Sequence, residues 1–250
     1  MKKRKGFTLS EVMISLIIVG AIAALTIPPL AENYRKTAYA TSLSVAISNF
    51  EKAMQTMMIK ENVTDLLDTK AWNTTKNNNN GSYTLNNTNF QNFQNELRKY
   101  LQIVDSSIGA PQRYASLQST KKANKNILFS TNPYFKTKDG VGYIITIPRN
   151  VKSSSRKNEA EMLLKGSSYL NKAAQVFIDV NGENKPNVIG RDLFKFELST
   201  DGHLYPFHGQ DYRLYYNTKK PKDPETECKQ KKNGDYCAAY LISNKFKMDY

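Results

Sequence analysis

The feature that most constrains this chain is an apolar run that begins close to its N-terminus. Residues 7–30 contain one acidic residue, Glu11, and no Lys, Arg or His. Roughly 20 apolar residues in a helix cross the hydrocarbon core of a bilayer, so this segment is long enough to span a membrane. Residues 2–5 are all basic, which predicts a cytoplasmic N-terminus and an exported remainder. The run therefore predicts an N-terminal membrane helix.

Glu11 is the residue that an ordinary membrane anchor does not explain. A charged side chain at the centre of a membrane helix costs about 2.5–3.5 kcal/mol, and less near an end, so an acid there is a functional candidate that needs a partner. The apolar run supplies no basic side chain. A cut between Gly6 and Phe7 would give Phe7 a free α-ammonium group. That group would pair with the Glu11 carboxylate, either in the same chain or in a neighbouring copy.

Residues 5–11 read Lys-Gly-Phe-Thr-Leu-Ser-Glu and lead into the hydrophobic helix. This pattern closely resembles the class III signal of type IV prepilins and type II secretion pseudopilins. The resemblance implies that a prepilin peptidase cleaves between Gly6 and Phe7 and then N-methylates Phe7. It makes Glu11 the carboxylate that recruits and registers the next subunit in a filament. Gly20 and Pro28 match two further family positions, between which the helix loosens in the assembled fibre.

The resemblance also implies where the chain resides and what it contacts. It predicts a single-pass protein of the inner (cytoplasmic) membrane, with a periplasmic or extracellular head, that later enters a filament. The expected partners are copies of itself or other pilins, prepilin peptidase and the inner-membrane assembly platform. The expected organisation is a cleaved leader (1–6), a transmembrane assembly helix (7–30), an amphipathic continuation of that helix (31–60) and a globular head (61–250).

Two other interpretations of the N-terminus are alternatives. One is a conventional secretory signal, which has a basic start, an apolar core and a small-residue cleavage site, here at residues 21–23. The other is a plain membrane anchor. An acid at the start of the apolar core and a long amphipathic continuation argue against the secretory signal.

A second periodic pattern follows the adjacent prolines Pro28 and Pro29. Each proline removes a backbone donor and disfavours helical geometry in the residue before it, which predicts a kink or a stretched segment. Beyond them, apolar residues recur at spacings of three and four, which predicts one buried stripe on a helix. The stripe consists of Tyr39, Leu43, Ala46, Ile47, Phe50, Met54, Met57 and Met58.

The remainder of the chain predicts a small antiparallel sheet. Residues 73–95 are rich in Asn and predict a loop, and residues 90–104 have the spacing of a short amphipathic helix. Strands are expected beyond about residue 125, at 141–147, 174–180 and 193–198, with a polar connector at 148–170. The expected class is α+β: a long N-terminal helix, with a membrane half and an amphipathic half, packed on a small antiparallel β-sheet in a pilin-like arrangement.

The chain has two cysteines, Cys228 and Cys237. An exported domain meets an oxidising compartment, so a disulfide is expected, and closing a loop of this size stabilises by roughly 2–3 kcal/mol in the chain-entropy model. Two thiols without a nearby His make a poor metal site. The resemblance adds that pilins commonly close a C-terminal loop in this way.

One loop carries oxygen ligands at alternating positions, as Ca²⁺ requires. Its candidate ligands are Asp179, Asn181, Glu183, Asn187 and Asp192. The spacing is not that of an EF-hand, although type II secretion pseudopilins do use a calcium-stabilised loop. The alternative is an Asn-Gly turn whose carboxylates face water. No cofactor is required by the rest of the sequence.

Enzymatic chemistry has little support in the sequence, and no enzyme is expected. The two histidines, His203 and His208, lack the one-turn spacing of a zinc protease, and no nucleophile motif accompanies them. DNA binding, as in some competence pilins, is the alternative function, because the formal net charge is +14 and a basic, Tyr-containing segment lies near the C-terminus. Its candidate residues are Arg213, Tyr215, Lys219, Lys220 and Lys222. The competing interpretation is a solvated surface loop in a chain rich in Lys.

Overall fold

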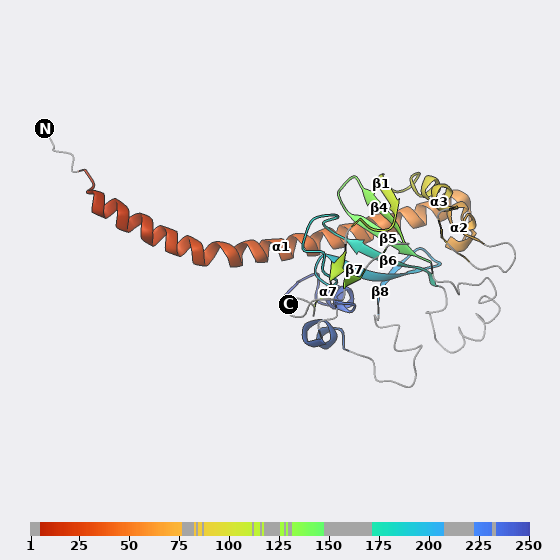
Figure 1. The fold of residues 1–250 in the computed structure, drawn as a ribbon. Helices are drawn as coiled ribbons and strands as arrows, with labels where there is room; N and C mark the ends of the chain where they lie inside the picture. Colours follow the sequence, from red (N-terminus) through yellow and green to blue (C-terminus); the bar gives the residue numbers. More distant parts are fainter. Residues whose placement is uncertain are drawn as a thin grey trace. The chain divides into compact units, whose positions relative to one another are not determined.

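The computed structural model describes residues 6–76, 83, 85–86, 88–111, 113–115, 117, 126–127, 129, 132–147, 172–207, 223–231 and 234–250 (Figure 1). The chain divides into two compact units between Ala38 and Tyr39. The first helix, α1 (Leu9–Glu61), contributes its N-terminal part to the first unit and its C-terminal part to the second.

In the first unit, α1 exposes its apolar side chains. It is long and apolar enough to cross a membrane, by length and composition, and the described residues do not bury its most apolar stretch. Leu9 and Leu25 are both 78% exposed. Contiguous apolar surface of this kind marks a site for lipid or for another protein.

Helix α1 passes through Pro28 and Pro29 without interruption. The continuous helix rules out an unwound segment at these prolines, whereas a kink there stays a prediction. Proline has a φ angle compatible with a helix, so two lost hydrogen bonds can be tolerated when the bonds on either side remain. One turn earlier, the hydroxyl of Thr26 donates to the carbonyl of Ile22 at 2.9 Å. Loosening of the helix in a fibre, between Gly20 and Pro28, stays a prediction.

The second unit is built on an antiparallel six-stranded sheet with the order β1-β4-β5-β6-β7-β8. The strands are β1 (Ile103–Ile108), β4 (Pro133–Thr137), β5 (Gly142–Thr146), β6 (Lys172–Asp179), β7 (Leu193–Ser199) and β8 (Leu204–Pro206). Strands β4 to β8 pair with their sequence neighbours, and β1 pairs with β4 at one edge. A separate ribbon joins β2 (Tyr114–Ala115) to β3 (Asn126–Ile127).

Short helices complete the second unit. After α1 come η1 (Leu66–Asp68), α2 (Lys70–Asn73) and α3 (Phe90–Leu97); near the C-terminus come α6 (Pro224–Thr226), the π-helical turn η5 (Glu227–Lys231) and α7 (Cys237–Ser243). The rings of Trp72 in α2 and Phe93 in α3 meet edge-on, with their centroids 5.2 Å apart. These side chains belong to the same core cluster as the sheet.

The apolar stripe of α1 packs on the sheet, as its spacing predicted. Its buried members include Leu43, Ala46 and Phe50. The Phe50 ring stacks on Tyr143 of β5 at 5.2 Å, and the Tyr143 hydroxyl donates to the carbonyl of Ala46 at 3.1 Å. Tyr39 and Ile47 are half-buried against the same core. The long helix, the sheet that follows it and this contact confirm the α+β, pilin-like class.

The opposite face of the sheet has its own apolar layer. Because successive side chains of a strand point to opposite faces, Ile144 lies away from the α1 side on which Tyr143 lies. Ile144 packs in a second cluster with Phe177 of β6 and with Tyr114 and Phe129 from the segment after β1. The sheet is thus covered on both faces.

The predicted strands agree with the structure better than the predicted helix around residue 100. The strands at 141–147, 174–180 and 193–198 correspond to β5, β6 and β7. The helix predicted for 90–104 is too long, because α3 ends at Leu97 and β1 begins at Ile103. Pairing of Ile103 with Thr137 of β4 decides this boundary, and that partner lies far along the chain. The connector at 148–170 lies outside the described residues.

Candidate assembly site

The N-terminus of α1 places the carboxylate of Glu11 beside the predicted cleavage point. Its Oε2 accepts the backbone N–H of Thr8 at 2.8 Å and the Thr8 hydroxyl at 2.9 Å. In return, the Glu11 N–H donates to Oγ1 of Thr8 at 3.3 Å. This reciprocal pair is a capping box, which satisfies donors that the first turn of a helix leaves open. This role of Thr8 was not predicted, although Thr-x-x-Glu before an apolar run is its sequence signal.

The capping box also helps to explain why an acidic residue is tolerated in the apolar run. The two donors of Thr8 partly compensate the charge of Glu11. The Phe7 nitrogen is separated from the Thr8 nitrogen by three covalent bonds, which keeps the two atoms within about 4 Å. A free amine at Phe7 would therefore form close to the carboxylate.

Gly20 has no packing role among the described residues. A Cβ built at Gly20 meets no atom within 4 Å. Glycine inside a helix costs about 0.5–1 kcal/mol relative to alanine, so the residue has a conformational cost and no internal benefit. Small residues allow close approach of a neighbouring helix in a membrane.

The two cysteines form the expected disulfide, between η5 and α7. Next to it, the ammonium group of Lys229 contacts the carboxylates of Glu225 and Asp249, each at 3.0 Å. The Tyr240 hydroxyl donates to Asp249 at 2.8 Å. Hydrogen bonds from Lys229 and then from Tyr240 lower the pKa of Asp249. The disulfide and this cluster together hold the C-terminal segment in place.

The residues of the predicted calcium loop have their own partners. Asp179 is buried and accepts the Tyr114 hydroxyl at 2.6 Å. Asp192 is buried and accepts the backbone N–H groups of Asn187 and Val188, each at 2.6 Å. Burial raises the pKa of Asp192, and these two donors oppose that rise. Both carboxylates are therefore engaged by donors of the chain itself.

The other predicted calcium ligands are one carboxylate, which forms an ion pair, and two buried amide oxygens. Glu183 pairs with Lys136 at 3.2 Å. The side-chain oxygens of Asn181 and Asn187 are buried and have no hydrogen-bond partner among the described residues, which would suit a cation. Within that part of the chain, however, no three His, Cys, Asp or Glu side chains are grouped so that they could hold a metal ion. The donor set does not fit a Ca²⁺ site with several carboxylates, and calcium binding stays a prediction.

The remaining predicted site residues cannot be placed together. Arg213, Tyr215, Lys219, Lys220 and Lys222 lie outside the described residues, as does His208. His203 follows β7, where its ring contacts the Gln55 amide at 3.2 Å and lies 3.6 Å from Glu51 of α1. These contacts tie the turn before β8 to α1.

Comparison with known proteins gives one match, at the N-terminus. The family model of the prokaryotic N-terminal methylation motif matches residues 1–27. Neither the curated proteins nor the solved structures give a match to the chain. The matched span contains Gly6, Phe7, Glu11 and Gly20, which are the residues of the site described above. The chain therefore carries the class III signal of type IV pilins and pseudopilins.

Proposed function

We propose that this chain is a structural subunit, a pilin, minor pilin or pseudopilin, of a type IV pilus or a type II secretion-type filament. The observation that carries the proposal is the methylation motif at residues 1–27, with its acid at the start of a fully exposed apolar helix. Prepilin peptidase removes residues 1–6, and the helix then packs against copies of itself or against other pilins. The role is structural and not catalytic.

Assembly depends on Glu11 in this proposal. In a bundle of apolar helices, an unpaired carboxylate is costly, whereas a carboxylate paired with an amine fixes the stagger of neighbouring helices. The capping box holds the Glu11 carboxylate near residue 7, where cleavage creates the amine. Apolar packing supplies the attraction, and the Glu11–Phe7 pair supplies the register.

The test is incorporation of Glu11→Ala into filaments. We expect the variant to insert into the membrane normally and to be lost from sheared filament fractions, measured by immunoblotting of both fractions. Glu32→Ala is the matched control, because Glu32 lies on the same helix beyond the apolar run and pairs with Arg35 at 3.8 Å. Normal incorporation of Glu11→Ala would contradict the proposed mechanism.

Processing is measured separately by mass spectrometry of the purified chain. The wild-type protein is expected to begin at N-methylated Phe7, and Gly6→Ala is expected to keep the leader. A mature N-terminus at any other residue would overturn the proposal. In a strain that lacks this chain, loss of long fibres, loss of secretion with fibres intact, and loss of DNA uptake distinguish a pilus subunit, a pseudopilin and a competence pilin.

A further inference from the structure

The sheet of the second unit has two outer strands, β1 at one edge and β8 at the other (Figure 1). The outer side of such a strand carries backbone N–H and C=O groups that no neighbouring strand bonds, and a strand of another molecule can pair with them. In an antiparallel strand, alternate residues direct these groups outward. Whether two copies of the chain can join their sheets therefore depends on the outward N–H groups of β1 and β8.

Hydrogen bonds at both ends of β8 show which of its residues face outward. The carbonyl of His203 accepts the Ser199 N–H at 2.9 Å, and the Phe207 N–H donates to the carbonyl of Lys195 at 3.2 Å. Both bonds join β8 to β7 or to the residues that flank these strands. Because the residues alternate, Tyr205 also faces β7, and its two neighbours in β8 face outward.

These two outward residues of β8 leave no N–H group for another strand. The Leu204 N–H donates to Oε1 of Glu51 at 2.8 Å. Pro206 has no N–H group to offer. Glu51 lies on α1, so the long helix and a proline together protect this edge of the sheet.

On β1, the residues that face outward are Ser106 and Ile108. The Gly109 N–H donates to the carbonyl of Asn132, the residue before β4, at 2.9 Å. Two residues earlier, Ser107 faces β4 in the same way, so its neighbours on either side are turned away from β4.

The side chain of Asp105 occupies the first of these outward donors. Its Oδ1 accepts the N–H of Ser106 at 2.8 Å. The Asp105 side chain is exposed, as expected for a group on the outer edge. The pairing with β4 also shifts register between Ile103 and Asp105, which limits the regular part of this edge to residues 105–108. An incoming strand must therefore displace a carboxylate within a short edge.

We propose that Asp105 prevents two copies of this chain from joining sheet to sheet, by holding the Ser106 N–H that the β1 strand of a second copy would otherwise bond. The pairing that it prevents is an antiparallel β1–β1 contact related by a two-fold axis. Pairing of β1 with β8 of the next copy, which would extend into a fibre of sheets, is blocked separately by Glu51 and Pro206. The inference does not depend on the proposed filament, because it concerns the sheet and not the N-terminal helix.

The test is sedimentation velocity of the full-length protein in detergent over a range of concentrations. About 0.3 M NaCl screens the charge of the exposed carboxylate. We expect Asp105→Ala to self-associate at least about tenfold more tightly than the wild type, because each copy then offers the Ser106 N–H. Asp105→Asn removes the charge but keeps an accepting oxygen, and it is expected to sediment as the wild type does. Asp201→Ala is the matched control: this exposed carboxylate also accepts a backbone N–H, that of His203 at 3.0 Å, but in the turn before β8.

A double variant identifies the surface through which the copies associate. Ser106→Pro, added to Asp105→Ala, removes the outward N–H and leaves the bonds between β1 and β4, so it should restore the sedimentation of the wild type. Trp72 fluorescence verifies that each variant is folded, since this side chain is fully buried. The proposal is overturned if Asp105→Ala sediments as the wild type does, if Asp105→Asn associates as strongly as Asp105→Ala, or if the folded double variant still associates.

Discussion

At the scale of single residues, two buried aspartates organise the loop between β6 and β7. Asp192 turns the loop back on itself by accepting the N–H groups of residues 187 and 188. Asp179 instead reaches a distant partner, the hydroxyl of Tyr114 in β2. The first interaction is local, and the second ties the small β2–β3 ribbon to the main sheet. A buried carboxylate needs such donors, because it is costly to remove from water.

We predict that Tyr114→Phe destabilises the head by about 1–3 kcal/mol, because a buried carboxylate loses a donor while the ring packing is retained. Urea unfolding of the full chain in detergent measures the change. The fluorescence of Trp72 is a suitable signal, since it is the only tryptophan and is fully buried in the head. The control is Tyr34→Phe, at a tyrosine that is 78% exposed. A change in the Tyr114 variant no larger than in this control would contradict the prediction.

At the scale of elements, the C-terminal segment docks on the turn that precedes β7. Gly234 and Gly190 approach so closely that a Cβ on Gly190 would meet both the Gly234 backbone and Sγ of Cys237. Tyr250 adds a hydrogen bond from its hydroxyl to the Gly190 carbonyl at 2.7 Å. The disulfide therefore closes a segment that is already fitted against the sheet.

A comparison of two glycines with nearly the same φ angle distinguishes backbone strain from steric crowding at this contact. Gly234 has a φ of 82°, and Gly140, in the β4–β5 turn, has a φ of 86°. A Cβ at Gly140 meets nothing within 4 Å, whereas one at Gly234 would overlap the carbonyl oxygen of Ile189. We predict that Gly140→Ala costs about 1–2 kcal/mol from backbone strain alone. Gly234→Ala should cost about 1–3 kcal/mol more, from overpacking. Urea unfolding would disprove this interpretation if both variants lost equal stability.

At the scale of the whole molecule, the head is held together by its own core. The stripe of α1, both faces of the sheet and the C-terminal helix α7 are buried against one another. The buried carboxylates of the β6–β7 loop are satisfied by donors of the chain.

We therefore predict that the folded head does not require calcium. Addition of EDTA should leave the midpoint of thermal unfolding unchanged. A rise in the midpoint with CaCl₂ that is abolished by Asp192→Asn would show instead that the loop binds the ion. MgCl₂ at the same concentration controls for ionic strength.

Features that depend on neighbouring residues could be predicted from the sequence. The acid in the apolar run, the cleavage motif around Gly6, and the three-and-four spacing from Leu43 to Met58 are local patterns, and each indicates a physical requirement without reference to the rest of the chain. The strands β5 to β7 were recognisable for the same reason. A disulfide between the only two cysteines followed from composition and from the expectation that the chain is exported.

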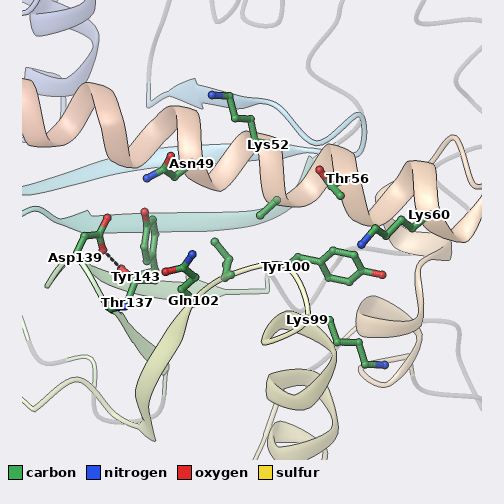
Figure 2. A pocket seen from close by; sticks show the side chains of 13 residues that line it. Asn49, Lys52, Thr56, Lys60, Lys99, Tyr100, Gln102, Thr137, Asp139 and Tyr143 are labelled. Atoms are coloured by element: carbon green, nitrogen blue, oxygen red, sulfur yellow. Dashed lines mark hydrogen bonds between the residues drawn. The ribbon is translucent and has the colours of Figure 1, made fainter.

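Contacts between residues that are distant in the sequence became known only from the folded chain. The end of α3 and the start of β1 depend on pairing with β4, the partner of Asp179 is Tyr114, and Gly234 meets Ile189 across the fold. A cavity beside α1 likewise combines residues of α1 with residues far along the chain, such as Gln102 and Tyr143 (Figure 2). Strand pairing and side-chain contact depend on packing against partners that are remote in sequence, so local patterns carry no information about them.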